Sequence, residues 1–146
     1  MKKIYFKKVD INHKKILFKW YNLKSVLRSS LKGKKFTFQE HNKWISKQLT
    51  SDNILKIIYF SKNPIGVIRL EKKRVFYLIS YMIVPKFRRK GFAFKAIKKI
   101  ISELKNKNIK KIVAIVKKDN TPSIKIFSKL KFKKINNMKN KRLLKF

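Results

Sequence analysis

Residues 81–93 decide the fold, and they read Tyr81-Met82-Ile83-Val84-Pro85-Lys86-Phe87-Arg88-Arg89-Lys90-Gly91-Phe92-Ala93. An apolar strand ends at Pro85, a basic turn follows, and a long helix begins near Gly91. The exposed N–H groups of a helix start, at the positive end of its dipole, bind phosphate well. A glycine there also lets a diphosphate approach the backbone closely. The pattern predicts a phosphate-binding turn, although an ordinary strand-to-helix turn with solvated lysines explains these residues equally well.

On both sides of this stretch, apolar periodicity predicts one α/β domain over residues 1–146, with no internal repeat and no linker. Thr37 and Glu40 form a capping-box pattern at the start of a helix. Residues 112–116 are continuously apolar, as in a strand buried on both faces. In chain order, we expect a strand at 3–9, helices from 16 and from 37, strands at 54–60, 65–70 and 75–84, a helix after 91, a strand at 112–116, a helix from 119 or 120 to 130, and a closing strand within 132–146.

The composition is strongly basic, with 42 Lys and Arg against 6 Asp and Glu, which gives a net charge of +36. A polyanionic partner, either nucleic acid or an anionic membrane surface, would explain this charge. The lysines are spread over almost every segment, however, which favours compositional drift. The chain has no cysteine and only 2 histidines, so disulfides and a Cys nucleophile are excluded and no metal site is expected. No apolar segment has the length of a signal peptide or a membrane span, so we expect a cytoplasmic protein.

Two motifs resemble those of one enzyme family. The run Arg88-x-x-Gly91-x-Ala93 is similar to the acetyl-CoA pyrophosphate motif of the GNAT acetyltransferase family, Arg/Gln-x-x-Gly-x-Gly/Ala. Residues 120–132 are similar to that family's later segment, Asn-x-x-Ala/Ser-x-x-x-Tyr/Phe-x-Lys-x-Gly-Phe, and they follow an expected strand, as in the family. The resemblance implies a single-domain α/β GNAT fold, with a mixed, mostly antiparallel central sheet and helices on both faces. It also implies acetyl-CoA as the cosubstrate.

The resemblance implies three sets of contacts with acetyl-CoA. Backbone N–H groups at the end of a splayed strand would hold the pantetheine and the acetyl carbonyl, at Met82, Ile83 and Val84. The loop that wraps the pyrophosphate comprises Arg88, Arg89, Lys90, Gly91, Phe92 and Ala93. The residues that flank the cofactor arm are Asn120, Ser123 and Phe127. For Phe127, packing in the core is an alternative that is compatible with this role.

The sequence departs from the family at the catalytic positions. Leu78 stands where many relatives have the Glu that acts as general base, and Phe127 stands where many have a Tyr that protonates the leaving thiolate. Without a cysteine, the amine must attack the thioester directly in a ternary complex. The candidates for accepting its proton are His41, which we rank first, Glu71 and Tyr81. His41 could instead lie on a helix surface, and Glu71 could pair with a neighbouring lysine.

The amino-terminal half resembles the acetyltransferases of pseudaminic acid biosynthesis. The matching segments are Trp20-Tyr21-Asn22-x-x-x-Val26-x-Arg28, Glu40-His41-x-x-Trp44 and Ile65-Gly66-x-Ile68-Arg69-x-Glu71. Those relatives acetylate the 4-amino group of a UDP-linked 4-amino-4,6-dideoxy sugar. The resemblance implies a nucleotide-sugar acceptor bound by Trp20, Arg28 and Arg69, because guanidinium groups pair with phosphates and aromatic rings stack on a base or a sugar. For the rings of Trp20 and Trp44, core packing is the favoured alternative.

Two other functions stay open. A protein or ribosomal-protein N-acetyltransferase shares the fold and the cofactor loop, although few acidic residues are present to build a peptide groove. A basic nucleic-acid-binding module that merely keeps the fold would need a continuous basic face with exposed aromatic residues. The scattered lysines argue against such a module. A homodimer is also left open.

Overall fold

The computed structural model describes residues 2–138 and 141–146. Within these residues, the chain forms one sheet of seven strands in the order β1-β2-β3-β4-β5-β7-β6. The strands are β1 (Ile4–Lys8), β2 (Ile54–Phe60), β3 (Asn63–Lys72), β4 (Tyr77–Ile83), β5 (Ile112–Lys117), β6 (Lys133–Met138) and β7 (Lys141–Lys145). The helices are η1 (Ile11–His13), α1 (Lys14–Tyr21), α2 (Lys24–Ser29), α3 (Phe38–Thr50), η2 (Pro85–Phe87), α4 (Phe92–Asn106) and α5 (Thr121–Lys129).

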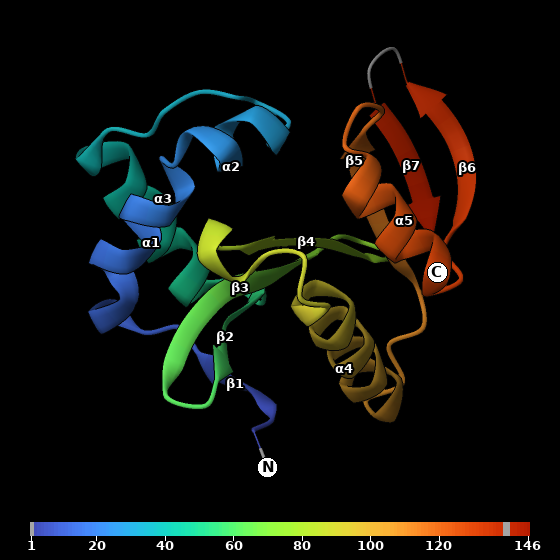
Figure 1. Ribbon diagram of the computed structural model, residues 1–146, viewed down its shortest axis with the longest axis horizontal. Coiled ribbons are helices and arrows are strands. Elements are labelled where there is room, and N and C mark those ends of the chain that lie inside the picture. Colours follow the sequence, from blue (N-terminus) through green and yellow to red (C-terminus); the bar gives the residue numbers. More distant parts are fainter. Residues whose placement is uncertain (1, 139–140) are drawn as a thin grey trace.

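Helices cover both faces of the sheet (Figure 1). Strand side chains alternate between the faces, so the sheet contributes to two separate cores. Val67 and Met82 pack with α1, α2 and α3, whereas Ile68 and Ile83 pack with α4 and α5. The predicted class, a single α/β domain with a mixed sheet between two helical layers, is confirmed.

The sheet separates between β4 and β5. These two strands are parallel and pair at only two positions of the described chain, Tyr77 with Ile112 and Leu78 with Val113. All other neighbouring strands described are antiparallel, and β5 continues along β7 as far as Lys117. Figure 1 shows β5, β7 and β6 turned away from β1–β4. Residues 79–83 of β4 therefore have a paired edge toward β3 and an open edge on the β5 side.

Three helices begin where the sequence predicts. The amide oxygen of Asn120 accepts the N–H of Ser123 at 3.3 Å and caps α5. The hydroxyl of Thr37 accepts the N–H of Glu40 at 3.1 Å and caps α3. Gly91 precedes α4 with a φ of 77°, a left-handed conformation that glycine adopts without steric cost.

None of the described helices has both the length and the apolar character needed to cross a bilayer.

Two elements differ from the sequence prediction. The expected helix from residue 16 is interrupted at Asn22, and a short α2 follows it. The cause is local: the Asn22 side chain pairs with the backbone of Phe36, donating at 3.0 Å and accepting at 2.7 Å, and Leu23 is extended. The closing strand expected within 132–146 is in fact two antiparallel strands, β6 and β7, and β7 lies between β5 and β6.

Candidate active site

The open edge of β4 presents backbone groups of alternate residues. The N–H of Val84 donates to the carbonyl of Ile65 on β3 at 2.9 Å, so it is already paired. In an antiparallel pair the polar groups of alternate residues face the partner strand, so the N–H of Met82 also faces β3. Of the three amides predicted to hold the pantetheine, that of Ile83 lies on the open edge. The amide of Tyr81 lies there too, and counting back in steps of two from Ile83 would have predicted it.

The loop between β4 and α4 folds back onto the end of the strand. The Nε of Arg88 donates to the carbonyl of Ile83 at 2.8 Å. Arg89 has a φ of 59° and Gly91 a φ of 77°, so the chain turns sharply on both sides of Lys90. A Cβ built at Gly91 would meet nothing within 4 Å. This loop is open toward its outer side.

The first turn of α4 has backbone donors and a firm anchor. Gly91 provides no side-chain cap, so the N–H groups of the first turn are free of side-chain partners from the N-cap. Phe92 is buried and packs on Phe60 and Phe87, which fixes the start of the helix, and the small Ala93 is half-buried. Lys90 lies over the ring of Phe87. A sharply turned loop, free amides and adjacent cations fit the pyrophosphate of acetyl-CoA.

Tyr81 connects β4 to α5. Its hydroxyl donates to the Oγ of Ser123 at 3.1 Å, and its ring lies edge-on to Phe127 at 5.9 Å between centroids. Burial raises the pKa of Tyr81, while the hydrogen bond with Ser123 and the charge of Arg88 act in the opposite direction. Phe127 is almost fully buried and also packs on Phe132, so the core-packing alternative describes its side chain. The strand end, the basic loop and α5 therefore meet around one hydroxyl.

A second group of side chains lies on the other face of the sheet, and we call it the α3-side cluster: Tyr21, Trp44, Arg69, Glu71 and Ser80. The guanidinium of Arg69 lies over the Trp44 ring, 5.8 Å from its centroid, and its Nε is 3.3 Å from the Oγ of Ser80. Tyr21 packs edge-on against Trp44. Burial raises the pKa of Tyr21 to about 12, although Arg69 opposes the shift, so this phenol stays neutral. Ser80 was not predicted, but it lies directly opposite Arg69 across β3 and β4.

Glu71 places a carboxylate beside the position where Leu78 lacks one. The two residues are directly opposed on β3 and β4, so their side chains project from the same face of the sheet. The Nζ of Lys73 lies 2.6 Å from one oxygen of Glu71, and Arg69 lies 3.7 Å from the other. The hydrogen bond from Lys73, reinforced by the charges of Arg69 and Lys47, lowers the pKa of Glu71 against the effect of burial. The expected pairing with a lysine is present, and it keeps the carboxylate ionised.

His41 lies in the core between α1 and α3. Its side chain has no exposed surface, so the alternative of a surface histidine is wrong. Its Nε2 lies 3.1 Å from the carbonyl of Lys14, and its ring stacks on Trp44 and packs on Phe18. Burial lowers the pKa of His41, so the ring is neutral at neutral pH. In this position the imidazole packs against the ring of Trp44 and is not accessible to solvent.

The predicted acceptor residues are separated by the fold. Trp20 is 6% exposed in the same core, so its ring face is not available for stacking. Arg28 is exposed on α2, and its carbonyl accepts the Nζ of Lys117 at 2.8 Å. This bond joins α2 to the end of β5 across the separation of the sheet. Arg69 is the predicted acceptor residue that belongs to the α3-side cluster.

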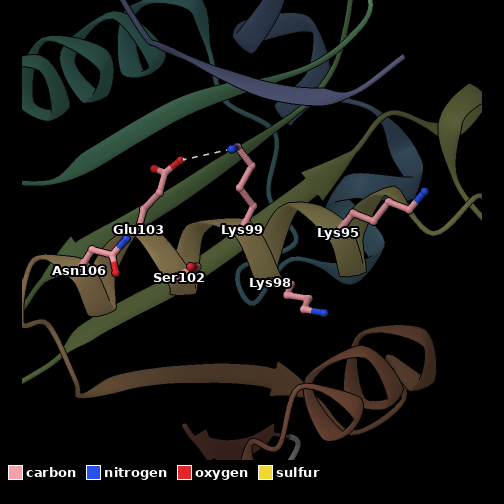
Figure 2. A pocket seen from close by; sticks show the side chains of 6 residues that line it. All are labelled: Lys95, Lys98, Lys99, Ser102, Glu103 and Asn106. Atoms are coloured by element: carbon pink, nitrogen blue, oxygen red, sulfur yellow. Dashed lines mark ion pairs between the residues drawn. The ribbon is translucent and has the colours of Figure 1, made fainter. Parts of the chain in front are cut away.

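Two open hollows of the described surface lie away from these groups. One is an open hollow on the outward side of α4, lined by Lys95, Lys98, Lys99, Ser102, Glu103 and Asn106 (Figure 2). The other is lined by Lys105, Lys110 and Phe146. Neither contains a predicted site residue. Across the described residues, no group of three or more His, Cys, Asp or Glu is placed to hold a metal ion.

A sheet that separates beside a strand end, with a basic turn and a helix start at that point, defines an α/β domain that binds a phosphorylated cofactor. The family model described as an acetyltransferase (GNAT) domain matches residues 3–133, so the chain belongs to this family. It is an acetyl-CoA-dependent N-acetyltransferase, and the observed loop and open strand edge fit acetyl-CoA as its cosubstrate.

Solved structures of known proteins share the fold. A domain from Methanocaldococcus jannaschii is 21% identical, with a TM-score of 0.91 and coverage of 100% of this chain and 99% of that one. Spermidine N-acetyltransferase from Vibrio cholerae, in complex with CoA and spermine, is 15% identical, with a TM-score of 0.83 and coverage of 97% and 92%. RimL, a ribosomal L7/L12 alpha-N-protein acetyltransferase, is 14% identical, with a TM-score of 0.84 and coverage of 98% and 89%. No curated protein sequence matches the chain. At these identities the likeness establishes the fold and not the acceptor.

Proposed function

We propose that the protein transfers the acetyl group of acetyl-CoA to the 4-amino group of a UDP-linked amino-dideoxy sugar, by direct attack of the amine in a ternary complex. The observation that carries this proposal is the α3-side cluster. There the guanidinium of Arg69 is held over Trp44 by Ser80 and Glu71, and Ser80 lies on β4, the strand with the open edge. An arginine fixed in this way can pair with a phosphate, and the neighbouring aromatic rings can contact a base or a sugar.

The charge of the molecule separates the candidate acceptors. A net charge of +36 repels a polyamine such as the spermidine named for the Vibrio cholerae structure. The same field attracts a nucleotide diphosphate. An anionic acceptor with one neutral amine is therefore the class that agrees with both the cluster and the field.

We propose Glu71 as the general base, in preference to His41. Glu71 is ionised, half-buried and on the same face as Arg69 and Trp44, opposite the position where Leu78 replaces a carboxylate. His41 is closed off within the core. Because the pKa of Glu71 is lowered, it is a weak base, and it would receive the proton only as the amine gains positive charge during attack.

The test compares acceptors and two variants of equal charge. Acetyl-CoA turnover would be measured with a UDP-4-amino-4,6-dideoxy sugar, with spermidine and with a peptide that has a free amino terminus, all at one ionic strength. Arg69→Met should raise the KM for the UDP-sugar by about tenfold or more, as expected when a charged hydrogen bond is lost. Lys98→Met removes the same charge from the outward side of α4 and should leave that KM unchanged (Figure 2). A preference for spermidine or the peptide, or equal losses in the two variants, would overturn the nucleotide-sugar proposal.

A further inference from the structure

The hydroxyl of Tyr81 has no role in the chemistry proposed so far. It lies on the face of β4 opposite Arg69, at the open edge, and it reaches across to Ser123 on α5. Position 127, one turn further along α5, carries a phenyl ring without a hydroxyl. In the described chain, Tyr81 thus supplies a phenolic donor where the strand end, the Arg88 loop and α5 meet.

The reaction creates a need for such a donor. When an amine attacks a thioester, an N–C bond forms and the C–S bond breaks. The electron pair of the C–S bond then stays on sulfur, and the proton of the amine leaves to a base. In a site that excludes water, the thiolate depends on hydrogen-bond donors of the protein for its stability.

We propose that Tyr81 donates a hydrogen bond to the departing thiolate of CoA and keeps its own proton throughout. This proposal rests on the acetyl-transfer chemistry proposed above. Proton transfer from Tyr81 would be unfavourable, because a thiol has a pKa of about 8.5 and a phenol one of about 10. Burial moves the pKa of Tyr81 further upward. The thiolate takes its proton from solvent when CoA is released.

Ser123 is the positioning residue in this arrangement. Its side chain is 6% exposed, and its hydroxyl accepts from Tyr81 while its own backbone N–H is held by Asn120. Ser123 therefore fixes the direction of the phenol before CoA binds. A hydroxyl both accepts and donates, so the Tyr81 proton can turn from Ser123 to sulfur without leaving an unpaired buried group.

The proposal is tested by the ionisation of bound CoA, which needs no acceptor. The ultraviolet absorbance of the CoA thiolate would be followed against pH in the complex, with the desulfo-CoA complex as the blank for tyrosine ionisation. Tyr81→Phe should raise the pKa of the bound thiol by about one to two, equivalent to a ten- to hundredfold loss of thiolate stabilisation. Tyr77→Phe makes the same change on the same face of β4, at the end paired with β5, and should leave this pKa unchanged.

A binding measurement and a second variant distinguish loss of the hydroxyl from loss of the folded structure. Tyr81→Phe retains the ring that packs on Phe127, and calorimetry at low pH, where the thiol is protonated, should show unchanged CoA binding. Adding Phe127→Tyr to Tyr81→Phe returns a hydroxyl from α5 and should lower the pKa of the bound thiol again. Equal thiol pKa values in wild type and Tyr81→Phe would overturn the role of Tyr81 alone. Failure of wild type to bind CoA at all would overturn the acetyl-transfer proposal instead.

Discussion

The chemical environment of single residues in this site depends on the residues paired with them on the neighbouring strand. β4 has Leu78 where many relatives have a Glu, and the directly opposed residue on β3 is Glu71, which provides a carboxylate at nearly the same place. Arg69 is held in the same way by Ser80. The face of each residue follows from strand alternation, but the partner across the sheet depends on the register of β3 and β4, which is set by the connection at residues 73–76.

The buried imidazole predicts a pH-dependent stability. Burial lowers the pKa of His41 in the folded protein, whereas in the unfolded chain the pKa is near the ordinary 6.5. Between these two values the unfolded chain binds a proton that the folded protein does not. The free energy of unfolding should therefore fall as pH drops below 6.5 toward the folded pKa, by at most about 1.4 kcal/mol per pH unit. Urea unfolding at a series of pH values measures this slope.

The two histidines allow a matched comparison. His41→Gln keeps a donor for the carbonyl of Lys14 but cannot ionise, so most of the slope between about pH 5 and about pH 7 should disappear. His13→Gln removes the other histidine, at the capped turn with Asp10, and serves as the control for the substitution itself. An unchanged slope in His41→Gln would contradict the assignment of a neutral buried ring.

At the scale of elements, capping signals and apolar periodicity were sufficient to predict most of the fold. The starts of α3 at Thr37, α4 at Gly91 and α5 at Asn120 follow from local chemistry. The break at Asn22 could not be predicted, because it depends on a contact with Phe36, fourteen residues away. The position of β7 between β5 and β6 could not be predicted either, because apolar periodicity predicts strands but not which strands pair with each other.

The start of α4 predicts the effect of a carboxylate at the cofactor loop. Gly91→Glu adds a side chain where a Cβ meets nothing within 4 Å, so the fold should survive, at a cost of about 1 kcal/mol for the left-handed φ. The carboxylate would compete with phosphate for the free amides of the first turn. Calorimetric titration at moderate salt should show acetyl-CoA and dephospho-CoA binding to wild type and not to the variant.

A second left-handed glycine provides the control. Gly33 has a φ of 62° in the loop after α2, so Gly33→Glu matches both the strain and the charge of the first change. It should bind acetyl-CoA like wild type. Equal loss of binding in the two variants would show that charge or strain, and not the loop, is responsible.

At the scale of the whole molecule, the positive charge acts on every ligand. Exposed positions of α4 illustrate its spread, since Figure 2 shows three lysines along one side of this helix and a single carboxylate, Glu103. Glu103 pairs with Lys56 at 2.8 Å and lies 3.9 Å from Lys99. Acidic side chains are too few to neutralise the surface, so a field of one sign surrounds the site.

This field predicts a strong salt dependence of cosubstrate capture. The kcat/KM for acetyl-CoA should fall by about tenfold or more as ionic strength rises from low values to about 0.15 M, because screening weakens the attraction of its phosphates. S-acetylpantetheine carries the same thioester without phosphates, and its kcat/KM should stay nearly constant. Parallel salt dependence of the two donors would show that the salt acts on folding or on a later step.

The short pairing between β4 and β5 has a consequence outside catalysis. A ligand that bonds to the open edge of β4 completes a sheet that the polypeptide alone leaves divided. A ligand that binds the folded form and not the unfolded form raises the free energy of unfolding, and this effect grows as the ligand concentration rises above Kd. CoA and acetyl-CoA carry the same pantetheine arm, so either of them should slow proteolysis of the purified chain, whether or not an acetyl group is present.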